Sequence, residues 1–152
     1  YVFSDSKNPK VLSLTRQDLD YLDFDVKYEE FLKGGYVVSD GDDFTIVASG
    51  SELEIAFKIK AALLEYSVRI VSVPILNKLS NMKNEEINEL LKNKHVFPIE
   101  LGRSIGWESY LGRITKTFSI DSFGESAPIE DLEKNFGFDV PTITKEIIKY
   151  LN

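Results

Sequence analysis

Residues 44–73 have the sequence FTIVASGSELEIAFKIKAALLEYSVRIVSV, which predicts a strand, a helix and a second strand in immediate succession. The apolar run Phe44–Ala48 is typical of a buried strand. Ser51 is a natural helix N-cap, and Glu54 three residues later predicts a capping box. The helix has one apolar face at three- and four-residue spacing, formed by Ala56, Ile59, Leu63 and Tyr66. Val68–Val73 is predicted as the second strand.

Strands and helices continue to alternate on both sides of this unit. Further strands are predicted at residues 11–15, 36–38, 96–99 and 115–120, and helices at 84–93, 106–110, 126–137 and from Asp139 onward. This alternation predicts an α/β fold with a mostly parallel sheet that is covered by helices on both faces. Residues 18–33 are acidic and contain aromatic residues without a clean period, so we interpret them as a linker. The compact unit is therefore expected to begin near Phe44, after an extension of about 42 residues.

The composition fits one globular domain and excludes several functions. The 152 residues include 25 acidic and 18 basic side chains, for a formal net charge of −7. We therefore expect no nucleic acid and no anionic membrane as a partner, because both need clustered positive charge. There is no cysteine and only one histidine, which excludes cysteine-ligated metal sites and sites of several histidines. The chain begins with Tyr1 and its only methionine is Met82, so we expect a processed chain or a piece of a longer protein.

Ser49-Gly50-Ser51 lies at the end of a predicted strand and the beginning of a helix, where open α/β sheets commonly bind ligands. Free backbone N–H groups at this point could bind an anion, or the serines could simply cap the helix. Glu52 and Glu54 would repel a phosphate from that helix end. We therefore favour the capping interpretation.

Three further residues are candidates for chemistry, each with a structural alternative. Glu100 follows an apolar strand and could act as a general acid or base, but we favour a carboxylate that is bonded to loop amides or paired with Arg103. His95 enters the same strand without another histidine or a nucleophile near it, which favours a surface histidine or a hydrogen-bonded loop histidine. Trp107 is more typical of a core residue than of a stacking platform for bases.

Arg16, within Thr15-Arg16-Gln17, is the strongest candidate for binding a ligand. It directly follows a predicted strand and is one of only four arginines in the chain. A guanidinium group at such a position can bind an oxyanion through two parallel hydrogen bonds. The alternative is a structural ion pair with the acidic linker, and the residues alone leave both possibilities open.

Seven short motifs stand in order along the chain: Leu14-Thr15-Arg16-Gln17, Gly34-Gly35-Tyr36-Val37, Ala48-Ser49-Gly50-Ser51-Glu52-Leu53, Arg69-Ile70-Val71-Ser72-Val73-Pro74, Ile99-Glu100 with Gly106-Trp107, IDSFGESAP at residues 120–128, and Phe136-Gly137-Phe138. Together they resemble the C-terminal part of the transketolases, the thiamine-diphosphate enzymes that move two-carbon ketol units between sugar phosphates. Thr15 stands where that family usually has serine, and Ser119 where it usually has glycine.

The resemblance implies a three-layer α/β/α domain with a five-stranded, mostly parallel mixed sheet. It implies that residues 1–42 are the tail of a preceding pyrimidine-binding domain plus a linker, and that residues 43–152 form the C-terminal domain. In the family, two upstream domains hold thiamine diphosphate and Mg²⁺ (or Ca²⁺), so no cofactor, metal or catalytic residue is expected in this chain. The one site residue that the resemblance transfers is Arg16, as a ligand of the sugar phosphate.

The expected function is accordingly that of a non-catalytic C-terminal domain of a transketolase in the pentose phosphate pathway. Its expected partners are the upstream domains and a second subunit of a homodimer, and its expected location is the cytoplasm. One alternative is the docking domain of a related thiamine-diphosphate enzyme, of the 2-oxo-acid dehydrogenase β-subunit type. Another is a free-standing regulatory module that binds a small ligand.

Overall fold

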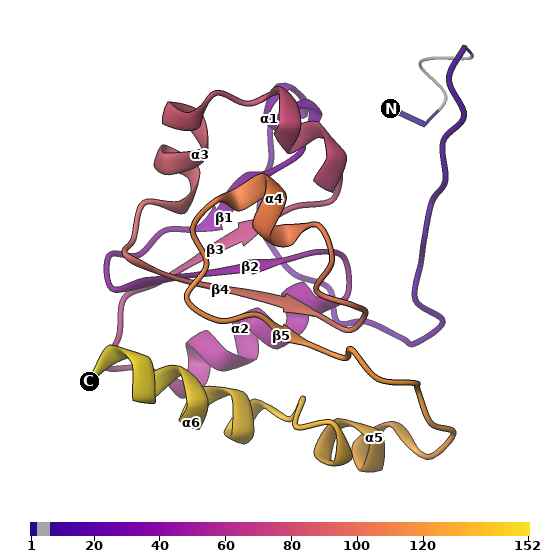
Figure 1. Ribbon diagram of the computed structural model, residues 1–152, viewed down its shortest axis with the longest axis vertical. Coiled ribbons are helices and arrows are strands. Elements are labelled where there is room, and N and C mark those ends of the chain that lie inside the picture. Colours follow the sequence, from indigo (N-terminus) through magenta and orange to yellow (C-terminus); the bar gives the residue numbers. More distant parts are fainter. Residues whose placement is uncertain (3–6) are drawn as a thin grey trace.

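The computed structural model describes residues 1–2 and 7–152, and its centre is a five-stranded mixed sheet (Figure 1). The strand order is β1-β3-β2-β4-β5, and only β1 is antiparallel to its neighbour. The strands are β1 (Tyr36–Ser39), β2 (Phe44–Ala48), β3 (Val68–Ser72), β4 (His95–Glu100) and β5 (Phe118–Ser119). This confirms the expected α/β class and the mostly parallel sheet.

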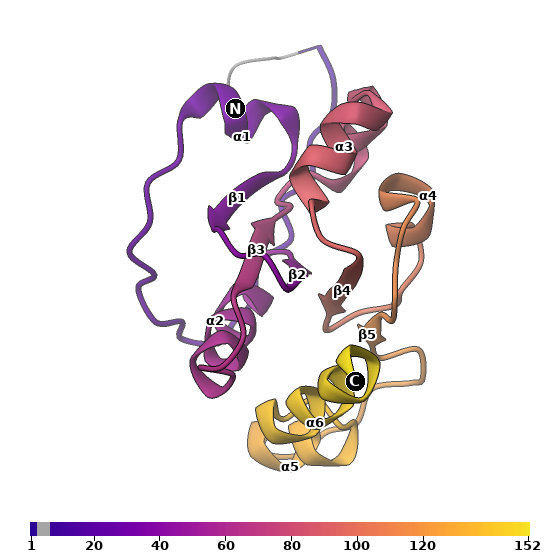
Figure 2. The ribbon, with the colours of Figure 1, turned by 90° about the vertical axis from the view of Figure 1, so that its left-hand side faces the viewer.

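Helices cover both faces of the sheet, as Figure 2 shows most clearly. One face is covered by α2 (Glu52–Ala62), α5 (Ile129–Asn135) and α6 (Val140–Leu151). The other face is covered by α1 (Tyr28–Lys33), the 3₁₀ helix η1 (Leu76–Asn81), α3 (Asn84–Leu91) and α4 (Trp107–Leu111). The molecule therefore has the three layers that were expected.

The two faces of the sheet have separate apolar cores. In β2, Ile46 packs into the core beneath α2 and α6, whereas the next residue, Val47, packs into the core beneath α3 and α4. Successive side chains of a strand point to opposite faces, so a central strand that is covered on both sides must be apolar throughout. Burial of β2 along its whole length explains why this run was a clear sequence signal.

The extension differs from its prediction in two respects. Residues 11–15 form no strand, and Val11 and Leu14 are 96% and 74% exposed. Their alternating pattern suits a strand, but no strand of the described chain lies beside them to supply hydrogen bonds. The predicted linker also contains a helix, α1, which ends at Gly34 with a left-handed φ of 104°.

Smaller corrections concern the ends of elements. The predicted capping box is absent, because Ser51 has a helical backbone conformation and its hydroxyl donates to Glu52 Oε2 instead. The strand predicted at 115–120 is reduced to β5, with two further backbone bonds, from Thr115 N to Val96 O and from Ile120 N to Gly102 O. The last helix follows Asp139 as predicted, and Asp139 caps it, since Asp139 Oδ1 accepts a hydrogen bond from Thr142 N at 3.0 Å.

None of the helices in the described part of the chain combines the length and the apolar character that a membrane span requires.

Candidate functional site

A large cavity lies at the carboxyl ends of β2 and β4, and we call it the carboxyl-edge cavity. Its volume is about 870 Å³. One wall is formed by the loops that follow the two strands, and the other by the extended segment around Arg16. The lining residues are Ser13, Leu14, Thr15, Gln17, Asp18, Leu19, Ser49, Gly50, Ser51, Glu52, Glu100, Leu101 and Gly102. The fold thus brings together three regions that the sequence analysis treated separately.

The carboxyl-edge cavity is acidic. Its lining includes the carboxylates of Asp18, Glu52 and Glu100, and no lysine, arginine or histidine of the described residues lines it. Glu52 is only 7% exposed. Its Oε1 accepts a hydrogen bond from Leu101 N at 2.9 Å, and its Oε2 accepts one from the Ser51 hydroxyl at 3.0 Å. A cavity of this charge disfavours phosphate and other anions.

Glu100 is the one lining residue whose ionisation is clearly disfavoured. Burial, and then the nearby Glu52 carboxylate, raise the pKa of Glu100 above its ordinary value. Two hydrogen bonds oppose this shift: Gly102 N donates to Oε1 at 3.1 Å, and the Trp107 indole donates to Oε2 at 3.3 Å. The loop-amide interpretation of Glu100 is confirmed, but the pairing with Arg103 is wrong, because Arg103 lies 3.9 Å from Asp121 Oδ1 instead.

The anion-binding interpretation of Ser49-Gly50-Ser51 is disfavoured by its backbone as well as by its charge. The N–H groups of Glu52, Leu53 and Glu54 donate to the carbonyls three residues earlier, at 3.2, 3.3 and 3.2 Å. These are the groups that would have to point at a bound anion. Because they already bond within the turn, the region begins a helix and forms a wall of the cavity.

Arg16 is exposed and points to no partner in the described part of the chain. Its neighbours Thr15 and Gln17 line the carboxyl-edge cavity, but Arg16 does not. Gln17 N donates to Thr15 Oγ1 at 3.2 Å, which forms a small turn around Arg16. No ion pair or hydrogen bond of the Arg16 side chain is found among residues 1–2 and 7–152. The structural ion pair with the acidic linker is therefore not formed there.

Of the other two candidates, His95 is half-buried in a strand and does not lie in a loop, and Trp107 lies in the core. His95 begins β4, at the end of that strand opposite Glu100, and its ring stacks on Phe97 with centroids 6.5 Å apart. Trp107 is 1% exposed within the core beneath α3 and α4, as expected of a core residue. Neither residue lines the carboxyl-edge cavity, and the one link to it among the described residues is the hydrogen bond from the Trp107 indole to Glu100.

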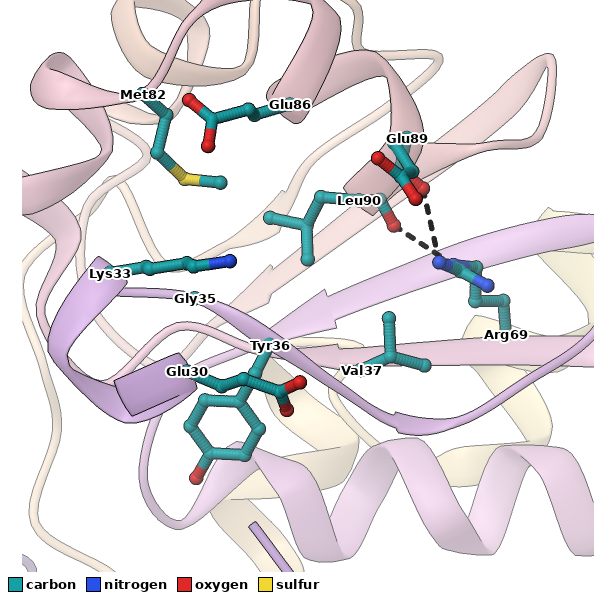
Figure 3. Close-up of a pocket in the computed structure, with 10 residues that line it drawn as sticks. All are labelled: Glu30, Lys33, Gly35, Tyr36, Val37, Arg69, Met82, Glu86, Glu89 and Leu90. Carbon is teal, nitrogen blue, oxygen red and sulfur yellow. Dashed lines mark hydrogen bonds between the residues drawn. The ribbon is translucent and has the colours of Figure 1, made fainter. Parts of the chain in front are cut away.

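A smaller cavity of about 230 Å³ lies between α1, β1 and α3 (Figure 3). Its lining includes Glu30, Lys33, Arg69, Glu86 and Glu89. The Arg69 guanidinium is occupied there, because Nε donates to Leu90 O at 2.9 Å and Nη2 to Glu89 O at 3.0 Å. This arginine therefore caps the end of α3 and is not a free anion ligand.

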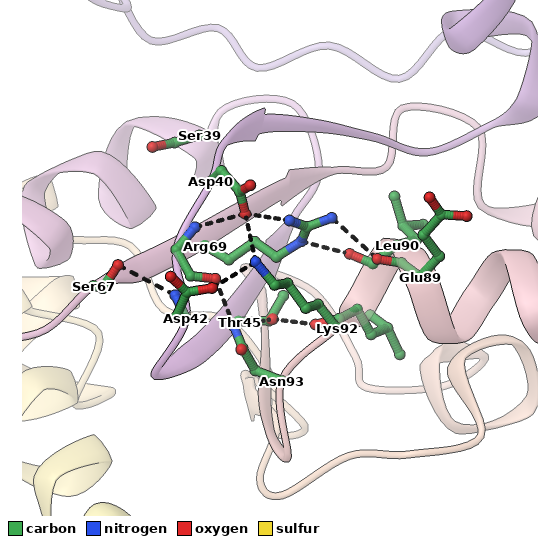
Figure 4. Close-up of polar contacts among 12 residues, drawn as sticks. Ser39, Asp40, Asp42, Thr45, Ser67, Arg69, Glu89, Leu90, Lys92 and Asn93 are labelled. Carbon is green, nitrogen blue, oxygen red and sulfur yellow. Dashed lines mark hydrogen bonds and ion pairs between the residues drawn. The ribbon is translucent and has the colours of Figure 1, made fainter.

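The same guanidinium belongs to a polar network beside the β1–β2 loop (Figure 4). Arg69 pairs with Asp40, and Lys92 lies 2.5 Å from Asp42 Oδ1. The Gly41 amide and the Arg69 guanidinium hold the pKa of Asp40 below its ordinary value. A Cβ at Gly41 would lie 2.3 Å from the Val68 carbonyl carbon, so only glycine fits this loop. The network connects β1, β3 and α3, so its role is structural.

The strand order, with one antiparallel edge strand and helices on both faces, defines a three-layer α/β/α domain. Residues 34–139 match the family model described as the transketolase-like C-terminal domain. The chain belongs to the transketolase family.

Individual relatives agree with this assignment. The transketolase of Bacillus subtilis is 36% identical over 157 aligned positions, which cover 95% of this chain and 23% of that protein. The structure of transketolase from Leishmania mexicana has a TM-score of 0.68 at 33% identity, over 78% of this chain and 18% of that one. A transketolase mutant from Pichia stipitis has a TM-score of 0.77 at 26% identity, over 90% of this chain and 20% of that one. The chain thus spans about a fifth of the length of these relatives.

The described residues that line the carboxyl-edge cavity do not fit thiamine diphosphate or its metal ion. The carboxyl-edge cavity would place the diphosphate against carboxylates, with no cation of the described residues to neutralise it. No group of three or more histidine, cysteine, aspartate or glutamate side chains suited to a metal occurs within residues 1–2 and 7–152.

Proposed function

We propose that this chain is the C-terminal part of a transketolase, an enzyme that transfers two-carbon ketol units between sugar phosphates in the pentose phosphate pathway. The observation that supports this most strongly is the similarity to transketolases over 95% of the chain, from the segment around Arg16 to the last helix. Family membership also favours this function over a docking domain of the 2-oxo-acid dehydrogenase type and over an independent regulatory module.

Within the assembled enzyme, this chain has a structural task. Residues 1–42 form the tail of the pyrimidine-binding domain and the linker, and residues 43–152 form the C-terminal domain. Thiamine diphosphate and Mg²⁺ (or Ca²⁺) bind to the upstream domains, in keeping with the acidic cavity found here. The C-terminal domain packs against those domains and supports a cytoplasmic homodimer.

Arg16 is the one residue of this chain that binds substrate, through the phosphate group of the sugar. Its guanidinium is exposed and has no competing partner in the described structure, which leaves its donors available for a bidentate contact. A phosphate that is remote from the reacting carbonyl is bound equally in the ground state and the transition state. Loss of such a contact raises KM more than it lowers kcat.

The test is Arg16→Ala in the assembled enzyme, assayed with acceptors that have or lack a phosphate. A charge-assisted hydrogen bond contributes about 1.5–3 kcal/mol, so kcat/KM for phosphorylated acceptors should fall about 10- to 150-fold. Glycolaldehyde, which has no phosphate, should react at nearly the same rate as before. Arg16→Lys should recover only part of the loss, because a point charge cannot form the two-pronged contact. An equal loss with both acceptors would make Arg16 a structural residue.

A further inference from the structure

The linker between Arg16 and α1 is attached to the α/β unit at one place. Leu22 and Phe24 are half-buried and pack against the core beneath α2 and α6, whereas Tyr21, Asp23 and Asp25 are exposed. This alternation is that of an extended segment with one face on the protein. We call Asp20, Leu22 and Phe24 the linker anchor.

Phe24 forms the most specific contacts of the linker anchor. Its ring stacks on Phe57 of α2, with centroids 6.4 Å apart and an interplanar angle of 13°. It also meets Tyr36 of β1, at 6.5 Å and 44°. Aromatic pairs at these separations contribute energy beyond the burial of their area, and they fix the orientation of both rings. Phe24 thereby joins the linker to a helix and to a strand at once.

A polar contact reinforces the anchor nearer to Arg16. Asp20 N donates to Glu54 Oε2 at 3.4 Å, and Glu54 also pairs with Lys58 one turn further along α2. The hydrogen bond from Lys58 is the main cause that lowers the pKa of Glu54, so the carboxylate remains an ionised acceptor. The backbone of the extension is thus bonded to the first turn of α2.

Arg16 is close enough to the anchor for its position to depend on it. Asp20 is four positions after Arg16, and four extended residues span at most about 14 Å. The turn between Thr15 and Gln17 shortens this reach further. Gln17, Asp18 and Leu19, which lie between Arg16 and Asp20, line the carboxyl-edge cavity together with Glu52 and Glu100.

We infer that Phe24 and Glu54 are positioning residues for Arg16: they attach the linker to the α/β unit and so hold the guanidinium where the sugar phosphate binds. This inference rests on the proposed function of Arg16. It assigns the C-terminal domain a part in substrate binding, even though that domain contains no residue in contact with the substrate.

The experiment compares three variants of the assembled transketolase that contains this chain. Phe24→Ala should raise KM for a phosphorylated acceptor about 3- to 10-fold, because displacement of a binding group by an ångström or so is costly while the group itself remains. Glu54→Ala should raise the same KM about 2- to 3-fold, as expected for the loss of one long hydrogen bond. Tyr28→Ala is the matched control, since Tyr28 lies beyond the anchor and its ring stacks on Phe31 of the same helix. It should leave KM unchanged.

The pattern of KM values distinguishes positioning from simple loss of structure. In Phe24→Ala and Glu54→Ala, kcat with glycolaldehyde should stay close to that of the parent enzyme, and Phe24→Leu should restore part of the lost affinity. Equal effects on both acceptors in Phe24→Ala, or an unchanged KM in both anchor variants while Arg16→Ala is defective, would overturn the inference alone. If Arg16→Ala lowers kcat/KM equally for phosphorylated acceptors and for glycolaldehyde, the proposed function of Arg16 fails and the inference fails with it.

Discussion

Glu100 lies in an environment that disfavours its ionised form. The pKa of Glu100 is raised in the folded chain, first by burial and then by Glu52, so the folded state binds a proton more tightly than the unfolded state does. The folded state is therefore favoured below the ordinary pKa of glutamate, and that contribution is lost as the pH rises through the folded pKa. Arg103 lies with Asp121 and does not relieve this cost.

The expected result is a specific pH dependence of the difference between two proteins. The free energy of unfolding of Glu100→Gln should increase relative to that of the parent chain as the pH rises from about 4 to 7. Asp139→Asn is the control with opposite sign, because hydrogen bonds from Thr142 lower the pKa of Asp139. Its variant should lose stability relative to the parent chain as the pH rises over the range in which Asp139 ionises. Urea denaturation at several pH values measures both, and a flat difference for Glu100→Gln would contradict the account of this carboxylate.

At the level of elements, the sequence predicted best those strands that are buried on both faces, because such strands must be apolar throughout. The strands β2 and β3 are buried throughout and lie side by side in parallel, and both were predicted within one residue of their bounds. Residues 11–15 have the alternating pattern of a strand but form none. A segment becomes a strand only when a neighbouring strand supplies hydrogen bonds, and the pattern of the segment does not show whether that neighbour exists. Helix α1 was missed because none of its residues is buried, so it has no apolar period to detect.

The candidate site was predictable only in its parts. Arg16 and Glu100 could be singled out from composition and from their place after an apolar run. That the neighbours of Arg16 line one cavity with Glu100 depends on how residues 13–19 cross the sheet edge, and no local pattern encodes that crossing. The bond between Asp20 and Glu54 joins residues 34 positions apart, so it was equally hidden.

Hydrogen exchange should reveal this division between elements. Amides in Phe44–Ala48 and Val68–Ser72 should exchange most slowly, because they lie in the two central, fully buried strands. Amides of residues 7–19 should exchange fastest, since that segment belongs to no helix or strand. Protection of residues 11–15 comparable to that of β2 would mean that this segment pairs with a strand after all.

Across the whole molecule, the covered and uncovered surfaces indicate where the rest of an enzyme would bind. The α/β unit has two complete cores, whereas the extension exposes Val11, Leu14 and Tyr21 at 96%, 74% and 90%. Apolar side chains exposed in a row commonly mark an interface. In the proposed function, the upstream domains cover these side chains and bring the cofactor to Arg16.

The most direct test of this account is calorimetric titration of thiamine diphosphate with Mg²⁺ into this chain by itself. The account predicts no binding heat and no ketol transfer, because the acidic carboxyl-edge cavity repels the diphosphate and the described residues offer no metal cluster. Binding with a micromolar Kd would contradict it, because the chain would then hold the cofactor without upstream domains.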